Sequence, residues 1–204
     1  MNVTVLETEY FPCISWFAAY CCSESVAQWT DEHFVRSSYR NRCDLAGPHG
    51  RLRLSVPLAG GRNAQRKTRD VRVSYDDRWT VIHCRTLESA YRRTPFYTYF
   101  EDDLHHFFEQ RPSFLIDLNQ NALEWILRIL NLPGKFLDSP VQIEPTPCWL
   151  PKFTPASESQ TNYPTYLQPF IERNGFISGL SILDPLFCLG PAATRAYLET
   201  VVVR

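Results

Sequence analysis

The sequence predicts an α/β fold in which a mixed sheet opens with a βαβ unit and a largely helical C-terminal half follows. Two observations lead to this prediction. Residues 3–29 have the order strand, helix, strand, which is the unit of a parallel sheet. After residue 78 the apolar residues recur at helical spacing instead of alternating. A chain of 204 residues suits one domain, so we expect a single domain over residues 1–204.

The opening βαβ unit comes from three short segments. Residues 3–7 are a β-prone run, and residues 25–29 give a second strand. Between them residues 14–22 form an aromatic run that we expect to be helical. Pro12 lies near the first turn of this helix, where the missing N–H costs nothing.

A hairpin is the natural interpretation of the next two segments, residues 39–45 and 51–57, because Gly47-Pro48-His49-Gly50 separates them. Residues 51–56 alternate strictly, as a half-buried strand should. Residues 59–68 carry little apolar content and read as a loop, and residues 71–75 alternate again and predict another strand.

Helical spacing begins with residues 78–92, where Asp76 or Asp77 is placed to cap the helix. Further helices are expected over residues 95–108, over 120–130 after an Asn119 N-cap, over 163–172, over 181–188 and over 192–201. The segment 138–162 carries five prolines and is predicted to be a surface loop within the domain. The apolar helix faces predict a core that includes Trp79, Leu87, Phe96, Trp125, Leu183 and Phe187.

Composition excludes several classes of protein. Lys plus Arg is 21 and Asp plus Glu is 22, so binding of nucleic acid through net charge is not expected. No apolar stretch approaches the roughly 20 residues that cross a bilayer, and the start lacks the features of a secretory signal. Seven cysteines without a CxxC pair indicate a reduced, cytoplasmic protein without membrane insertion.

Motifs for metals, phosphates and nucleophiles are weak. Asp102-Asp103 and His105-His106 lie one helical turn apart and can be read as a metal site or as a solvated helix face; we favour the latter and predict no metal. No GxGxxG, P-loop or GxSxG pattern occurs, so the sequence points to no particular cofactor. Cys43 beside Arg42 is a candidate nucleophile, but a small buried strand residue is the better interpretation.

The densest group of polar and aromatic residues runs from Tyr75 to Asp103. Trp79 and His83 are four residues apart on one predicted helix, and Tyr91 extends the same face. Such a stripe is typical either of a ligand cleft or of an ordinary aromatic core, and both interpretations stay open here.

Several short blocks along the chain follow the order found in one protein family. They are Tyr39-Arg40-Asn41-Arg42-Cys43, Leu54-Ser55-Val56-Pro57, Ser74-Tyr75-Asp76 with Trp79 and His83, Glu88-Ser89-Ala90-Tyr91, Pro95-Phe96 with Tyr99, Phe114-Leu115-Ile116-Asp117-Leu118-Asn119, Gly175-Phe176, Leu180-Ser181-Ile182-Leu183-Asp184, Leu186-Phe187 and Gly190-Pro191. Together they resemble the WbqC-like protein family, particularly the form found in Bacteroidota. Many members open with Gln-Pro-x-Tyr-x-Pro-Trp; here Tyr10 and Pro12 are kept, and the Gln-Pro is absent.

The resemblance implies a role in surface polysaccharides. Some WbqC-like members lie in O-antigen gene clusters, where a glycine or other aminoacyl transferase role has been suggested. The resemblance thus implies a bacterial, cytosolic transferase, acting on acyl, aminoacyl or sugar-related groups, in surface-polysaccharide or O-antigen biosynthesis.

A transferase needs a donor site and a base. We expect a cleft lined by Tyr10, Asn41, Arg42, His83 and Tyr91. His83 would act as general base, oriented by Asp77, Asp76 or Asp184. Arg42 would bind the phosphate or carboxylate of an anionic small-molecule donor, such as a nucleotide-sugar or an acyl donor, and Asn41 would stabilise an oxyanion.

The alternative is a non-catalytic ligand-binding or protein-interaction module. There His83, Asn41 and Arg42 would only satisfy buried polar groups. Convergence of Arg42 and His83 on one solvent-reachable pocket favours the transferase, whereas saturation of both side chains by internal hydrogen bonds favours the module.

Overall fold

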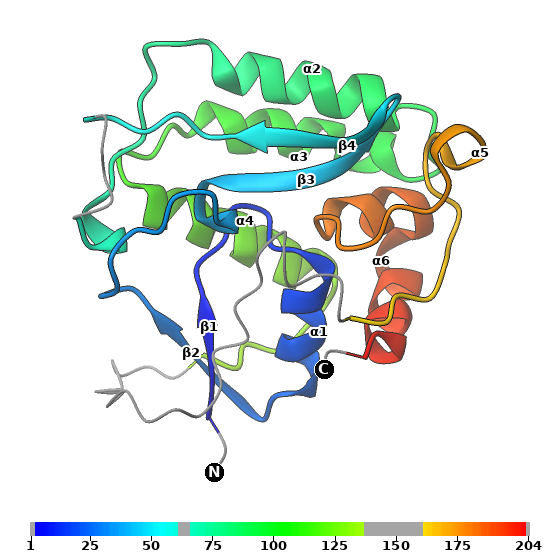
Figure 1. Cartoon of the computed structure of the whole chain (residues 1–204), viewed down its shortest axis with the longest axis horizontal. Coiled ribbons are helices and arrows are strands. Elements are labelled where there is room, and N and C mark those ends of the chain that lie inside the picture. Colours follow the sequence, from blue (N-terminus) through cyan, green and yellow to red (C-terminus); the bar gives the residue numbers. More distant parts are fainter. Residues whose placement is uncertain (1–2, 61–65, 137–160, 203–204) are drawn as a thin grey trace.

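A computed structural model describes residues 3–60, 66–136 and 161–202 and confirms the α/β class (Figure 1). The chain opens with β1 (Val3–Glu7), α1 (Ile14–Cys22) and β2 (Ser25–Trp29), at the predicted bounds. The two strands pair in parallel, with Val3 opposite Ser25. Helix α1 is therefore the crossover of the predicted βαβ unit.

The predicted hairpin is formed by β3 (Arg42–Gly47) and β4 (Gly50–Ser55), which pair antiparallel. Gly50 has φ 104°, a conformation that the turn requires and that other residues rarely adopt. Within the described residues the four strands form two separate two-stranded sheets.

Residues 71–75 do not form the predicted strand. Arg72 and Val73 make only isolated bridges, because their backbone partners belong to different loops. Ala59 donates to the Arg72 carbonyl, whereas Val73 donates to the carbonyl of Ser113. The alternating pattern here reflects one-sided burial without a neighbouring strand to continue the ladder.

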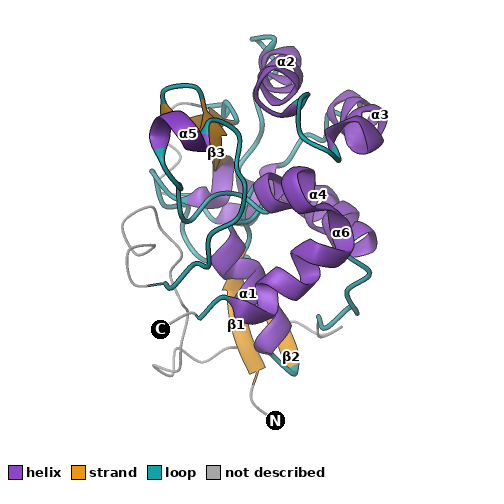
Figure 2. Cartoon of the chain, turned by 90° about the vertical axis from the view of Figure 1, so that its right-hand side faces the viewer, coloured by secondary structure: helices purple, strands orange, loops and turns teal. Residues whose placement is uncertain are grey.

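Helices dominate the C-terminal half, as predicted. They are α2 (Trp79–Tyr91), α3 (Tyr97–Glu109), α4 (Leu115–Ile129), α5 (Ile171–Asn174) and α6 (Leu183–Thr200). Figure 2 shows α2 and α3 side by side, with α4 and α6 beneath them. Helix α6 joins the two predicted closing helices across a kink at Gly190-Pro191, where Gly190 has φ 78°.

Both predicted N-caps are wrong. Helix α4 begins at Leu115, and Asn119 lies inside it, buried, with its amide donating to the Arg40 carbonyl at 2.8 Å. The N-cap position of α2 is Arg78, without a side-chain cap. The Asp76 carboxylate instead accepts from the Ser74 hydroxyl, so neither Asp76 nor Asp77 caps the helix.

The helix predicted over residues 163–172 is also wrong, since only Ile171–Asn174 is helical in this region. Pro164 and Pro169 interrupt the pattern. Gln168 then fixes a loop, because its side chain both donates to the Ile177 carbonyl and accepts from the Ile177 N–H. The predicted proline-rich loop over 138–162 lies outside the described residues except for its last two positions.

One core joins the helices to both sheets. Five of the six predicted core residues are buried, and Phe96 is partly buried against the same core. The cysteines that the structure describes are all free, and Cys148 lies outside the described residues. No helix in the described ranges has the length and apolarity needed to span a membrane.

Candidate functional site

His83 lies inside the core. Its side chain is 3% exposed, and Nδ1 is 3.0 Å from the hydroxyl oxygen of Tyr10, which is fully buried. A second hydrogen bond to the backbone of Ser55 raises the pKa of His83, but burial outweighs it and lowers that pKa to about 4. The imidazole is therefore neutral near pH 7 and a weak base.

Aromatic rings surround the imidazole. Trp79 and Phe108 pack edge-on against His83, with ring centroids 4.9 Å and 6.0 Å away. Phe108 also lines the cavity between α2 and α3, to which His83 does not contribute. The ring of Phe108 thus separates the histidine from this cavity.

Tyr91, two turns after His83 on α2, meets a different polar group. Its hydroxyl accepts from the Ala46 N–H at 3.0 Å and donates to Asp184 of α6 at 3.3 Å. The Asp184 carboxylate also accepts from Tyr166 and Gln168. Burial raises the pKa of Asp184 to about 7, although these hydrogen bonds oppose the shift. Tyr91 therefore joins β3 to α6 inside the protein.

Asn41 and Arg42 line a separate cavity of about 390 Å³ at the start of β3. Its lining residues are Phe34, Arg36, Ser37, Asn41, Arg42, Val56, Pro57 and Leu58. This volume falls within the range of small-molecule sites. The structure brings Asn41 and Arg42 together here, whereas Tyr10, His83 and Tyr91 are not among the lining residues.

The cavity carries two guanidinium groups and no carboxylate among its described lining residues. Arg42 is half-buried, and its Nε atom is buried without a hydrogen-bond partner among the described residues. Arg36 is exposed at the same cavity. A buried N–H without a partner is costly, and two guanidinium groups without a carboxylate in the described part of the lining make it positive, which favours an anion such as a phosphate or carboxylate.

Asn41 lines the cavity and is held in place by Val56, which lines it as well. Its side-chain amide donates to the Val56 carbonyl at 2.9 Å, and its own carbonyl accepts from the Val56 N–H at 2.8 Å. These bonds tie Asn41 to the end of β4 and fix the backbone from which Arg42 extends. Asn41 therefore positions the site, with one of its two side-chain N–H groups bound to Val56.

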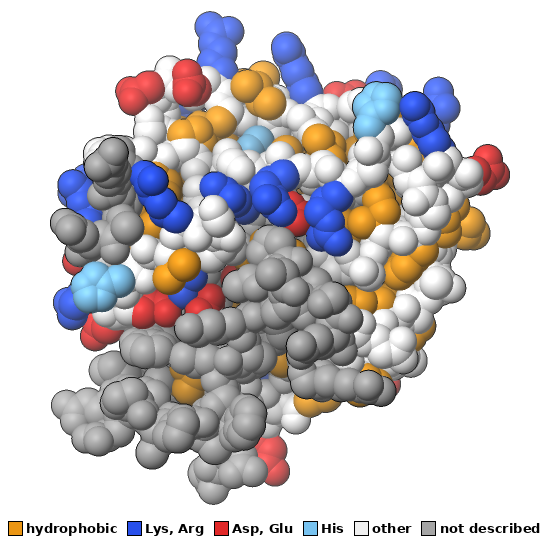
Figure 3. All heavy atoms as spheres, viewed as in Figure 1, with side chains coloured by type: hydrophobic (Ala, Val, Ile, Leu, Met, Phe, Trp, Pro, Cys, Tyr) orange, Lys and Arg blue, Asp and Glu red, His pale blue; other side chains and the backbone are white. Residues whose placement is uncertain are grey.

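Other arginines on the hairpin are already paired. Figure 3 shows a row of Lys and Arg side chains across the face where β3 and β4 lie. Arg51 and Arg53 of β4 both bind Asp44, whose side chain is fully buried. Hydrogen bonding to Asp44 raises the pKa of Arg53. Both guanidinium groups thus have a carboxylate partner within the hairpin, which distinguishes them from the arginines of the cavity.

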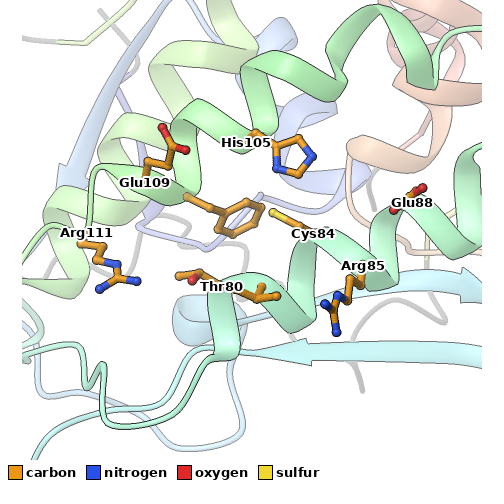
Figure 4. A pocket seen from close by; sticks show the side chains of 9 residues that line it. Thr80, Cys84, Arg85, Glu88, His105, Glu109 and Arg111 are labelled. Carbon is orange, nitrogen blue, oxygen red and sulfur yellow. The ribbon is translucent and has the colours of Figure 1, made fainter.

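The cavity between α2 and α3 has about 680 Å³ and mixed charge. Figure 4 shows Arg85 and Glu88 at one end and Glu109 and Arg111 at the other, with Cys84 between them. Burial raises the pKa of Cys84 to about 11, so the thiol is protonated at neutral pH. Cys84 is therefore not an activated nucleophile.

The last two candidates from the sequence are Asp77 and Cys43. Asp77 is exposed in the turn before α2. Cys43 is 1% exposed, and burial raises its pKa well above the usual range, as expected of a small buried strand residue. Across the described ranges no group of three His, Cys, Asp or Glu side chains could hold a metal.

Sequence reasoning missed Arg36. It is exposed and lies outside any strand or helix, so no periodicity marks it. The available signal was proximity, since Arg36 precedes Arg42 by only six residues around the short helical turn Tyr39–Asn41. Tyr166 and Gln168, which bind Asp184, were missed because the sequence predicts a helix over residues 163–172 instead of the observed loop.

The chain matches a known protein family. A model described as the WbqC-like protein family matches residues 8–145, which is more than half of the chain, and confirms the resemblance found in the sequence. The match includes the cavity with Arg36 and Arg42, as well as Tyr10, His83 and Tyr91. No curated protein and no solved structure matches the chain.

Proposed function

Because this chain belongs to the WbqC-like protein family, we propose that it binds an anionic small molecule at the cavity of Arg36 and Arg42. We propose further that this cavity is the donor site of a cytoplasmic transferase in surface-polysaccharide or O-antigen biosynthesis. The donor would be a nucleotide-sugar or an activated acyl compound, held by its phosphate or carboxylate.

One observation carries the proposal, namely the buried Nε of Arg42, which has no partner in the described part of the chain and belongs to a cavity that a second arginine also lines. A guanidinium offers two parallel N–H groups to a phosphate or carboxylate. An anion at this position would satisfy the Nε–H and neutralise Arg36 and Arg42 together. The ordered Asn41–Val56 pair supports a site of fixed shape.

The catalytic part of the proposal is separate from the binding part. His83 as general base would need access to the acceptor, and its low pKa and burial behind Phe108 weigh against that role. The observation that His83 hydrogen-bonds both Tyr10 and Ser55 favours a second candidate, a non-catalytic ligand-binding module with the same anion site.

A ligand-stabilisation screen tests the binding proposal. Pyrophosphate, nucleotide-sugars and acyl-CoAs should raise the Tm, whereas neutral sugars should not. Arg42→Lys should weaken binding, because the charge stays but the planar fork is lost. Arg92→Lys is the matched control, since Arg92 is exposed on the surface and pairs only with Glu88 among the described residues. Stabilisation by no anion, or equal loss in both variants, would refute the site.

Consumption of the donor distinguishes a transferase from a non-catalytic binding module. If His83 is the base, His83→Gln should keep ligand affinity and abolish transfer to an amine or hydroxyl acceptor. If the chain is a binding module, no donor that binds should be consumed by the wild-type protein. Mass spectrometry of the donor after incubation distinguishes these results.

A further inference from the structure

A third cavity, of about 720 Å³, lies between the C-terminal end of α2, residues 166–170 and helix α6. It shares no lining residue with the cavity of Arg36 and Arg42. The residues around it are Ser89, Ala90, Arg93, Thr94, Pro95, Tyr166, Leu167, Gln168, Pro169, Phe170, Cys188 and Leu189. The volume is that of a site for a small organic molecule.

The lining is mostly apolar and carries a single charge. Arg93 is the one charged residue among the described lining residues, and it is exposed at the cavity. Leu167 is 79% exposed, the largest exposed fraction among the large hydrophobic residues of the described chain. We propose that this cavity binds an amphipathic monoanion, with a hydrocarbon body against Leu167 and a carboxylate or phosphate at Arg93.

Hydrogen bonds to groups inside the protein hold the two neighbours of Leu167 in place. Tyr166 donates to the buried Asp184 at 3.1 Å, and Gln168 donates to the same carboxylate at 3.2 Å. Gln168 also makes two hydrogen bonds with the backbone of Ile177. The flanking residues of Leu167 are therefore fixed, so the side chain stays exposed at the cavity and a ligand does not have to order this wall on binding.

Charge complementarity selects the ligand class. A neutral apolar ligand would gain no attraction from the Arg93 guanidinium, and a cationic one would be repelled by it. An anion with an apolar body uses both features. For a straight-chain ligand each added CH₂ should tighten binding about fourfold until the cavity is filled, since burial of one CH₂ contributes about 0.8 kcal/mol.

Calorimetric titration of the whole chain with octanoate, decanoate and dodecanoate, below their micelle concentrations, tests the proposal. Decanol and decylamine are the neutral and cationic counterparts of decanoate. Arg93→Gln removes the charge, and Leu167→Gln removes the exposed apolar wall. The matched controls are Arg92→Gln and Ile82→Gln, because both positions are exposed on α2 or its end and neither lines the cavity.

We expect decanoate to bind more tightly than decanol or decylamine, and affinity to rise along the carboxylate series. Arg93→Gln and Leu167→Gln should each weaken decanoate binding about tenfold or more, and both controls should stay within about twofold of wild type. No binding of any carboxylate, equal binding of decanol, or an equal effect of Arg92→Gln would overturn the proposal. Competition between decanoate and pyrophosphate, the probe for the Arg42 cavity, would overturn it as well.

Discussion

The Tyr10 hydroxyl lies 3.0 Å from Nδ1 of His83 and joins the segment after β1 to helix α2 inside the core. The hydrogen bond to the Ser55 backbone raises the pKa of His83, so the imidazole donates its N–H to that backbone and accepts from Tyr10. One neutral imidazole thus connects α2, β4 and residue 10.

Removing the Tyr10 hydroxyl should destabilise the protein without touching the anion site. Tyr10→Phe leaves the buried Nδ1 of His83 without its partner, which costs about 1–3 kcal/mol of unfolding free energy. Tyr99→Phe is the control, since Tyr99 is 77% exposed and should change stability by less than about 0.5 kcal/mol. Urea unfolding measures both, and equal stabilities of the two variants would contradict the structural role of the pair.

Asp184 and His83 should make opposite contributions to the pH dependence of stability. Burial raises the pKa of Asp184 from 3.8 to about 7, so the native state keeps a proton that the unfolded state releases, and stability falls as pH rises between these values. The pKa of His83 is lowered from 6.5 to about 4, so its contribution rises with pH between these values. The two effects oppose each other from about pH 4 to 6.5.

Asp184→Asn should therefore reveal the contribution of His83 to the pH dependence of stability, because the opposing contribution of Asp184 is removed. In this variant the unfolding free energy should rise by roughly 3 kcal/mol more than in wild type between pH 4 and 6.5, because the opposing contribution of Asp184, about 1.4 kcal/mol per pH unit, is lost. Urea unfolding at several pH values within this window measures the slope. A slope equal to that of wild type would show that Asp184 is not protonated in the native state.

Gly190 should tolerate no side chain. Its φ is 78°, and a Cβ would lie 2.6 Å from the nearest ring atom of Phe96. Gly190→Ala should cost about 2–4 kcal/mol, because left-handed strain and overpacking add. Gly134→Ala is the control, since a Cβ there meets nothing within 4 Å. Thermal unfolding compares the two, and similar Tm values would contradict the tight contact at the α6 kink.

The buried Arg40 should be essential to the packing of the β1 end. Its guanidinium, 2% exposed, binds Glu7 at 2.8 Å and also binds Glu32. Arg40→Met leaves both carboxylates without this cation and should cost about 3–5 kcal/mol. The control Arg69→Met breaks an exposed pair with Asp31 and should cost less than about 1 kcal/mol. Comparable losses in urea unfolding would contradict the difference between these two ion pairs.

Local patterns predict the elements whose neighbours are close in sequence. The bounds of β1, α1 and β2 follow from the order of apolar, Pro and polar residues, and the hairpin follows from Gly47 and Gly50. Contacts from distant parts of the chain decide the rest. Asn119 has the chemistry of a cap, yet it donates to Arg40, 79 positions earlier, and is buried in a helix interior.

The same contrast between local sequence patterns and contacts from distant parts of the chain applies to the candidate site. Arg42 stands out in the sequence because a guanidinium in a structured segment needs a partner, whereas nothing in the exposed run around Arg36 marks its place at the same cavity. The sequence groups His83 with Arg42, but burial and the Tyr10 contact depend on tertiary packing that spacing does not reveal.

The most direct test of the anion site is the NMR signal of the Arg42 Nε–H, assigned by its loss in Arg42→Lys. Addition of pyrophosphate should shift this signal and slow its exchange with water, because the buried N–H gains an acceptor. The Nε–H signal of Arg53 should stay unchanged, since this N–H already donates to Asp44. An Arg42 signal that does not move at saturating pyrophosphate would contradict the proposed site.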